Sequence, residues 1–376
     1  MRFKQTDISL AGGLHDALKC AAPDARVIAA FDWDPLAIAV YEANHGSGIA
    51  RRKDISQLTA DEIEVFDADI WLASPACQPY TVLGLQKGVD DPRARSFLHL
   101  INEVLVTLAT RNKHPEYIIV ENVAGFETLG YQVSEFLLSP KQYGIPNARL
   151  RYYLAARKAE GVSGSSSRVL TTIPGDLGAV ESEGIKKIAD YLDPLPDQST
   201  LVPERILVRW GKDDVGYTHL IEGSGSILQI NEEMDTTEAF NEFAARQEAG
   251  DDDAVSTLHK LVLRYFSPEE LLRLFYLSRP TRPFVWPQNT SRKSKYRLIG
   301  NSVNVEVSSH RDSLRGQFYG HCSRLFCIEI SFTTGPSFDY CGCGQSLTKS
   351  KLSEGSTSSE LPGHAADEAD HDQNNG

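Results

Sequence analysis

The chain of 376 residues is predicted to be an α/β protein built on a mostly parallel sheet, and two observations in its first 160 residues predict this. Short apolar, β-rich runs recur through this part of the chain, at residues 27–32, 69–73, 117–122 and 150–156. Residues 96–111 carry apolar side chains at helical spacing and suit the crossover helix that joins neighbouring parallel strands.

Three polar side chains of different chemistry come at, or just after, the ends of these runs. Asp32 ends the first run, Cys77 follows the second, and Glu121 lies at the end of the third. An open α/β sheet binds its ligands at the carboxyl ends of its strands. We therefore expect two acids and a thiol to share one edge of the sheet.

The thiol lies in the most informative stretch, SerProAlaCysGlnProTyr at residues 74–80. Pro75 and Pro79 fix their own φ and push the residue before each towards extended geometry, so Cys77 is expected on a stiff loop. That position suits a nucleophile. A lone intracellular cysteine is also commonly a buried structural residue, and this stretch alone leaves both interpretations open.

The residue composition and the hydrophobic periodicity change after the predicted sheet. Residues 161–260 are rich in Ser, Gly and Asp and less periodic, which predicts a smaller, loop-rich domain. Residues 261–307 return to apolar and aromatic patterning. The last 30 or so residues are rich in Ser, Asp and Glu and contain little that could form a core, so we expect them to be disordered.

Composition narrows the class of protein. No run of 18 apolar residues could span a bilayer and no signal peptide is recognisable, so we expect a protein of the nucleus or cytoplasm with no membrane partner. Its six cysteines are then reduced, and the irregular spacing near the C-terminus fits no usual zinc site, so no metal is expected.

The net charge of −13 disfavours tight, indiscriminate binding to duplex nucleic acid. Any such contact needs a local basic patch. The best candidate is Arg292, Lys293, Lys295 and Arg297, although a short basic run is more often solvated surface.

Eight short motifs follow one another along the chain. They are GlyGlyLeuHis (12–15), PheAspTrpAsp (31–34), AspIle (54–55), ProAlaCysGln (75–78), AspProArg (91–93), GluAsnVal (121–123), GlyIleProAsnAlaArgLeuArg (144–151) and GlyAsnSerValAsnVal (300–305). Their order and spacing resemble the cytosine-5 methyltransferases over about residues 8–307. GluAsnValAlaGlyPheGlu (121–127) and GlyTyrThrHisLeuIleGluGlySerGlySer (216–226) are most similar to the DNA methyltransferase 2 family, which methylates tRNA, typically at an anticodon-loop cytosine.

The resemblance implies an architecture as well. Residues 1–160 would form a Rossmann-like, S-adenosylmethionine-binding catalytic domain, and residues 161–260 a target recognition domain. Residues 261–307 would return to complete the catalytic domain. Residues 308–376 depart from the family and are expected to be an atypical, largely disordered tail.

The resemblance also assigns catalytic roles. Cytosine carbon 5 attacks a methyl donor only after a thiolate has added to carbon 6, and Cys77 corresponds to that thiolate. Glu121 matches the acid that supports the electron density arriving on ring nitrogen 3. Arg149 and Arg151 would point from one strand face at the target base and its sugar-phosphate. Glu121 could instead be a strand-end cap or ion pair, and the arginines could be edge-strand charges.

The implied cofactor is S-adenosylmethionine. Asp32 would bind its ribose hydroxyls, Trp33 would stack on adenine, and Asp54 with Ile55 would contact the adenine amine and ring. The backbone of Ala11, Gly12 and Gly13 would approach the methionine part, and Ser74, Asn301 and Ser302 would close the pocket. The plainer interpretations are Trp33 in the core, Asp32 as a helix cap and Ser302 in a turn.

A target base must leave its stack to reach Cys77, which costs least in a single-stranded loop, so tRNA is the favoured partner. A DNA cytosine-5 methyltransferase and a catalytically inactive nucleic-acid-binding relative are the alternatives. The second alternative is motivated by Leu10, which replaces a family glycine, and by residues 4–7, which are polar for a central strand. Residues 128–132 are also too few for the usual crossover helix.

Overall fold

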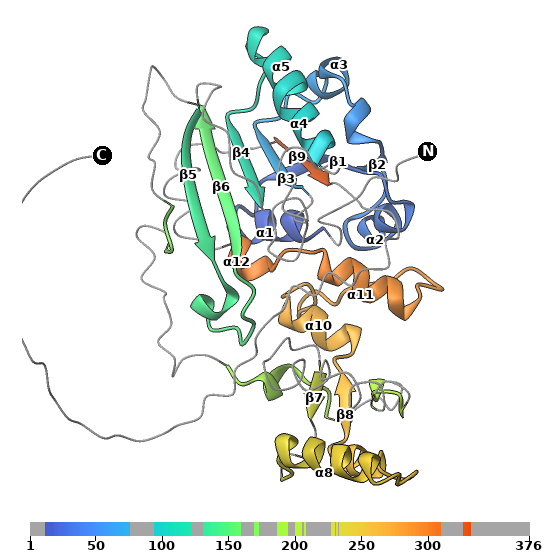
Figure 1. Cartoon of the computed structure of the whole chain (residues 1–376). Coiled ribbons are helices and arrows are strands. Elements are labelled where there is room, and N and C mark those ends of the chain that lie inside the picture. The colour runs from blue at the N-terminus through green and yellow to red at the C-terminus, as the bar shows by residue number, and fades with distance from the viewer. Residues whose placement is uncertain are drawn as a thin grey trace, which may run out of the picture.

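The computed structural model describes residues 12–75, 94–121, 131–158, 169–172, 186–194, 200–204, 207, 227–229, 231, 233–309 and 326–331. Within these residues lies a seven-stranded sheet of order β2-β1-β9-β3-β4-β6-β5 (Figure 1). Its strands are β1 (Arg26–Asp32), β2 (Ala50–Arg52), β3 (Ile70–Ser74), β4 (Tyr117–Glu121), β5 (Tyr131–Leu138), β6 (Arg151–Lys158) and β9 (Phe326–Ser331). The predicted α/β fold is confirmed.

The sheet is mostly parallel, as predicted. β1 is parallel to β2 and β9, and β3 is parallel to β9 and β4. β6 is antiparallel to both of its neighbours, β4 and β5. The four apolar runs that the sequence predicted to be strands therefore all lie in one sheet.

Strand β3 is covered on both faces, which explains its unbroken apolar sequence. All five of its residues are buried. Because side chains alternate along a strand, Trp71 and Ala73 join one hydrophobic cluster and Ile70 and Leu72 join another. Neighbouring strands and helices on the two faces supply the remainder of these clusters.

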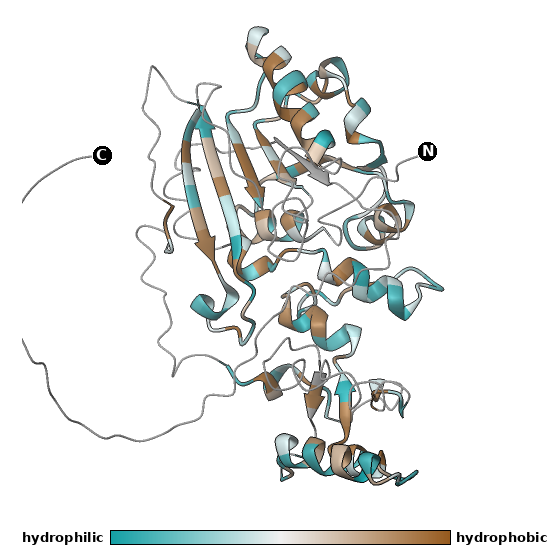
Figure 2. Cartoon of the chain, in the orientation of Figure 1, coloured by the Kyte–Doolittle hydropathy of each residue, from teal (hydrophilic) through white to brown (hydrophobic). Residues whose placement is uncertain are grey.

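One face is covered by α3 (Ala60–Glu64) and by a helical stretch that runs from α4 (Arg95–His99) through a π-helical segment (Leu100–Leu105) to α5 (Val106–Thr110). The crossover helix predicted at 96–111 is thus confirmed. The other face is covered by α1 (Gly13–Ala21) and α12 (Val305–Ser309). Figure 2 shows apolar residues along β4 and β5, and apolar alternating with polar residues on α4 and α5.

A third hydrophobic cluster joins α1 to elements far along the chain. It contains residues of α2 (Pro35–His45), α10 (Pro268–Leu274) and α11 (Arg292–Gly300). The segment 261–307 therefore returns to pack beside the sheet. Among the described helices, none combines the length and apolarity that crossing a bilayer requires.

Strand β9 was not anticipated. Residues 326–331 belong to the segment expected to be largely disordered, yet they lie between β1 and β3 in the middle of the sheet. Figure 1 shows this strand, in orange-red, among the blue strands of the N-terminal part. Within the segment 308–376, these six residues and the last two residues of α12 (Val305–Ser309), Ser308 and Ser309, are therefore exceptions to the expected disorder.

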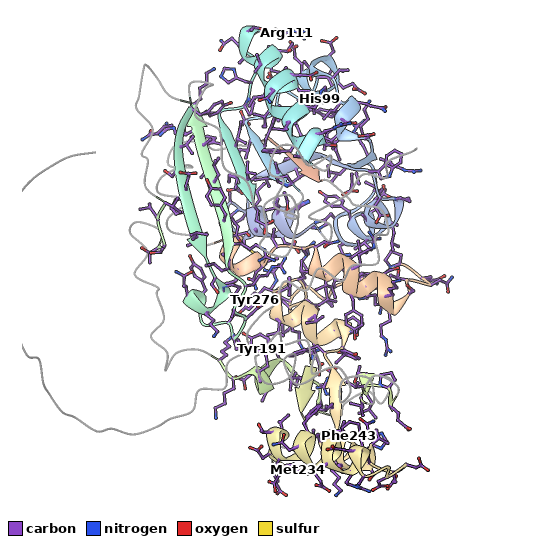
Figure 3. All side chains as sticks on the ribbon, viewed as in Figure 1. His99, Arg111, Tyr191, Met234, Phe243 and Tyr276 are labelled. Carbon is purple, nitrogen blue, oxygen red and sulfur yellow. The ribbon has the colours of Figure 1, made fainter. Side chains whose placement is uncertain are left out.

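A smaller unit lies beyond α10. It contains the antiparallel pair β7 (Ile227–Gln229) and β8 (Leu263–Tyr265) together with α8 (Thr236–Glu248) and α9 (Ser256–His259). Its own hydrophobic cluster includes Phe243, and Figure 3 places Phe243 and Met234 at the end of the molecule remote from the sheet.

Tyr191 lies nearer the sheet than Phe243 does (Figure 3). Burial is the main cause that raises the pKa of Tyr191 to about 12, and the neighbouring Tyr276 contributes in the same direction.

A buried ion pair joins this unit to α10. Arg264 on β8 donates two hydrogen bonds of 2.8 Å to the carboxylate of Glu270 on α10. Glu270 also accepts from the backbone N–H groups of Ser267 and Asp193, at 2.7 and 2.9 Å. Burial alone would raise the pKa of Glu270, but these bonds outweigh it and hold the pKa below its usual value.

The substitution Glu270→Gln is expected to lower the free energy of unfolding by about 3–5 kcal/mol, because it leaves the Arg264 charge buried without a countercharge. Urea unfolding followed by circular dichroism measures the loss. Asp251→Asn is the control, since it removes a carboxylate from the exposed Arg246–Asp251 pair and should change little. Equal losses in the two variants would contradict the role of the buried pair.

Candidate active site

The carboxyl edge of the sheet brings together the acids predicted from the sequence. β1 ends at Asp32, β3 at Ser74 and β4 at Glu121. Since Ala73 lies opposite Val120 in the parallel pair, the next residues along the two strands, Ser74 and Glu121, are also neighbours. The Ser74 hydroxyl donates a 2.9 Å hydrogen bond to Oε2 of Glu121, and both residues are buried.

Glu121 has a second partner on the adjacent strand. Nε of Arg151 lies 3.6 Å from Oε1 of Glu121. Tyr153 lies opposite Glu121 in the β4–β6 pair, and burial, followed by the charge of Glu121, raises its pKa. Glu121 is thus ion-paired, as its interpretation as a strand-end ion pair expected. It also lies at the carboxyl edge of the sheet, where β1, β3 and β4 end, as its interpretation as a catalytic acid required. We call this edge the rim.

Arg149 and Arg151 have different surroundings, contrary to the expectation that they share a strand face. β6 begins at Arg151, and Arg149 lies before it. The buried guanidinium of Arg149 donates to the carbonyl oxygens of Gly300 and Ser302, at 2.9 and 3.0 Å, and lies 5.0 Å from the ring centre of Phe275. β6 is flanked by β4 and β5, so Arg151 is not on an edge strand, and Arg149 is on no strand.

The two glycines at the start of α1 are required by close packing. Gly12 has φ +70°, and a Cβ built on it would lie 1.9 Å from Nε2 of His45. A Cβ on Gly13 would lie 2.9 Å from both Oγ of Ser302 and Cγ2 of Val303. The return segment thus approaches the glycine turn closely, as the predicted pocket-closing role of Ser302 required.

Ser302 carries an unusual polar atom. The residue is 1% exposed, and among the described residues its Oγ has no hydrogen-bond partner. Its neighbour Asn301 is the C-cap of α11. A buried hydroxyl of this kind next to a glycine turn suits a small-molecule ligand that supplies the missing partner.

The residues expected around adenine and ribose lie near the ends of β1 and β2. Oδ1 of buried Asp32 accepts from the backbone N–H of Asp34 at 2.6 Å, whereas Asp34, not Asp32, caps α2. Trp33 is 47% exposed, which excludes it from the core, and the Arg52 guanidinium lies 4.8 Å from its ring centre.

Asp54 and Ile55 have structural roles in the described residues. Asp54 caps the short 3-10 helix η1 (Ile55–Gln57) by accepting from the backbone N–H of Ser56 at 2.9 Å. Ile55 is buried in the cluster that contains Phe31. Cys77 and Ala11 lie outside the described residues, and Pro75 is the last described residue before Cys77.

The basic run predicted as a nucleic-acid contact begins α11. Lys295 pairs with Glu269 at 3.1 Å and lies over the ring of Trp286, and Arg297 pairs with Asp34. Lys295 and Arg297 therefore already have partners within the chain. Arg292 and Lys293, in the first turn of the helix, complete the run.

A cluster behind the glycine turn was missed by the sequence analysis. Nδ1 of His15 lies 2.7 Å from the Tyr41 hydroxyl, and the His15 ring stacks on His45 with 4.0 Å between centres. Arg282, in the return segment, extends into this cluster. Its guanidinium lies at hydrogen-bond distance, 3.1 Å, from Nδ1 of His45 and forms an ion pair with Asp16. The four-residue spacing of Tyr41 and His45, which puts them on one helix face, was the available signal.

Burial is the main cause of a strongly lowered pKa in this cluster. It lowers the pKa of His15 to about 3, with His45, Arg282 and Lys19 contributing in the same direction. His15 is therefore neutral in the folded protein at neutral pH.

Helices on both faces of a parallel sheet, a glycine turn at the start of α1 and carboxylates at the ends of β1 and β4 define an α/β methyltransferase fold. The chain belongs to the C-5 cytosine-specific DNA methylase family, which matches residues 8–310. The resemblance stated from the motifs is confirmed.

Individual relatives agree with this assignment. The chain is 37% identical to the tRNA (cytosine(38)-C(5))-methyltransferase of Schizosaccharomyces pombe, over 81% of this chain and 93% of that protein. The crystal structure of S. pombe Dnmt2 methyltransferase superposes with a TM-score of 0.61 and 35% identity, covering 82% of this chain and 95% of that one. A DNA (cytosine-5)-methyltransferase of Dictyostelium discoideum is 31% identical, over 79% of this chain and 90% of that protein.

The substitution Gly13→Ala is expected to lower the free energy of unfolding by about 1–3 kcal/mol, because its methyl group pushes against Ser302 and Val303. Thermal unfolding measures the change. Gly300→Ala is the control in the same return segment, since a Cβ there meets nothing within 4 Å. It should be neutral or stabilise the protein by about 0.5–1 kcal/mol. Unchanged stability in Gly13→Ala would show that the segment does not pack on the glycine turn.

Stability is expected to fall as the pH drops below 6.5, because the pKa of His15 is about 3 in the folded protein and 6.5 when unfolded. The unfolded chain then binds a proton that the folded chain does not, which costs about 1.4 kcal/mol per pH unit. Above pH 6.5 the contribution is complete and constant. Urea unfolding from pH 8 to pH 4 should show a shallower decline for His15→Gln, and parallel curves for the two proteins would refute the assignment.

Proposed function

We propose that this protein is an S-adenosylmethionine-dependent cytosine-5 methyltransferase that modifies an anticodon-loop cytosine of tRNA through a covalent Cys77 adduct. The observation that carries the proposal is the buried contact between Ser74 and Glu121, at the strand end that leads to Cys77. Because the chain belongs to the cytosine-5 family, we interpret this contact as part of the site that methylates carbon 5 of cytosine.

Cys77 is the proposed nucleophile. It follows Ser74 by three residues, and three residues of chain span at most about 11 Å. Chain connectivity alone therefore keeps its Cα within about 11 Å of the Cα of Ser74 at the rim. Its thiolate adds to carbon 6 of cytosine, which makes carbon 5 nucleophilic.

Glu121 is proposed to act on ring nitrogen 3, where this addition places electron density. In its protonated form, the carboxyl group of Glu121 donates a proton or a hydrogen bond to that nitrogen. Ser74 and Arg151 contact one carboxyl oxygen each, which fixes the orientation of the group before substrate arrives. Such preorganisation is a large contributor to transition-state stabilisation. After carbon 5 has taken the methyl group, water accepts the carbon 5 proton, and the electron pair of that C–H bond expels the Cys77 thiolate and releases the product.

The described residues fit the methyl donor. Among the described residues, the buried Ser302 hydroxyl has no hydrogen-bond partner, and it lies beside the Gly12–Gly13 turn. Asp32 is the last residue of β1, and the exposed Trp33 follows it. S-adenosylmethionine supplies the methyl group. Asp32 would bind its ribose, Trp33 its adenine, and the glycine turn with Ser302 its methionine part.

Arg149 contacts the return segment, whereas Arg151 contacts Glu121. Its bonds to the carbonyl oxygens of Gly300 and Ser302 tie the return segment to the sheet, so we assign it to pocket closure. Arg151, beside Glu121, remains the arginine proposed to face the target base.

RNA is favoured over DNA as the substrate for two reasons. The net charge of −13 and the internal pairing of Lys295 and Arg297 limit the positive surface available to a long duplex. The cost of extruding the target base is also least in a single-stranded loop. The name of the S. pombe relative supports the same choice.

Transfer of a labelled methyl group to a tRNA pool tests the proposal, with duplex DNA as the competing substrate. Cys77→Ser should abolish transfer, and Glu121→Gln should lower kcat by about 10²–10³-fold with little change in KM. Glu135→Gln is the matched control, because Glu135 lies in the middle of β5 rather than at a strand end on the rim. Its carboxylate accepts a hydrogen bond from the Tyr152 hydroxyl on β6.

The alternatives predict other results. Transfer to DNA but not to tRNA would establish the DNA methyltransferase. No transfer to either substrate by the unmodified protein would identify a catalytically inactive relative.

A further inference from the structure

One interior strand of the sheet, β9, comes from outside the part of the chain that matches the family. The match ends at residue 310, whereas β9 consists of Phe326–Ser331. β9 pairs in parallel with β1 on one side and with β3 on the other. Among the described strands, β1 and β3 are not neighbours, so β9 alone connects β1 and β2 to the rest of the sheet.

This position in the sheet must be occupied. The sides of β1 and β3 that face β9 each present a row of backbone N–H and C=O groups. Helices cover both faces of the sheet here, so water cannot reach those groups easily and a missing strand would leave them without partners. The position therefore requires an extended segment with an apolar sequence.

Residues 326–331 meet that requirement better than the N-terminal segment does. Their sequence is PheCysIleGluIleSer, with β-branched Ile328 and Ile330 opposite Trp71 and Ala73 of β3. The N-terminal alternative, residues 2–8, reads ArgPheLysGlnThrAspIle and has four consecutive polar residues. A register shift on β1 between Val27 and Ala29 adjusts that strand to β9.

β9 also sets the geometry of the rim. It ends level with its neighbours, since Ser331 lies opposite Ser74 and Ile330 lies opposite Phe31, the residue before Asp32. Neighbouring strands are about 4.8 Å apart, so one strand between β1 and β3 holds their ends about 10 Å apart. Asp32 and Ser74 lie at those two ends.

We infer that residues 326–331 are a positioning element of the cofactor site. This strand fixes the separation between Asp32, which would bind the ribose, and the Ser74–Glu121 pair at the catalytic end of the rim. Methyl-donor binding then depends on a C-terminal segment beyond the family match. The dependence on the methyl donor rests on the proposed function, whereas the place of the strand in the sheet does not.

Amide hydrogen exchange of the full chain, read by mass spectrometry, tests the strand itself. Backbone amides of residues 326–331 should exchange at least 100-fold more slowly than an unstructured peptide of the same sequence. Exchange at the unstructured rate, or protection of residues 2–8 in their place, would overturn the inference. This readout stands even if the protein fails to bind S-adenosylmethionine, a result that would count against the proposed function alone.

Two substitutions at one position test the link to the cofactor. Ile328→Pro removes a backbone donor from the middle of the strand and should weaken S-adenosylmethionine binding at least tenfold by calorimetry. Ile328→Val keeps the strand and should stay within twofold of the unmodified chain. Gln5→Pro is the control in the competing N-terminal segment and should also stay within twofold. A tenfold loss in Gln5→Pro with none in Ile328→Pro would assign the position to the N-terminus.

Discussion

The burial of β3 on both faces is the constraint from which the rest of the structure follows. A strand with Ile70 and Leu72 on one side and Trp71 and Ala73 on the other needs an apolar layer above and below it. The helices from α3 to α5 supply one layer, and α1 with α12 supplies the other. Since a buried strand must end where polar atoms can be satisfied, its last residue, Ser74, bonds Glu121 at the rim.

The same constraint explains why distant parts of the chain meet at the glycine turn. α1 and α12 contribute to the same hydrophobic cluster on one face of the sheet, and the close approach of Ser302 and Val303 leaves no room for a side chain at Gly13. Arg149 donates hydrogen bonds to the carbonyl oxygens of Gly300 and Ser302 in this return segment. The surroundings of the glycine turn thus come from the beginning, middle and end of the family-matched region.

Local patterns predicted the elements well, and contacts between distant residues were less accessible. Apolar runs and helical spacing located β1, β3, β4, β6 and the crossover helix, because each depends on a few consecutive residues. The motifs located Asp32, Ser74 and Glu121 on one edge. The place of β9 depends on strand order, and the contacts of Arg149 depend on carbonyl oxygens 151 and 153 positions away, which no short pattern encodes. The contact between His15 and His45 also joins separate helices, and the four-residue spacing of Tyr41 and His45 was its one local signal.

The position of β9 has a consequence for how the protein is made. Its partner strands β1 and β3 are synthesised within the first 74 residues, but the strand that joins them ends at residue 331. Pairing over such long sequence separations is slow, and unpaired strand sides are prone to aggregation. The two parts of the sheet on either side of β9 therefore stay unjoined until most of the chain has been synthesised.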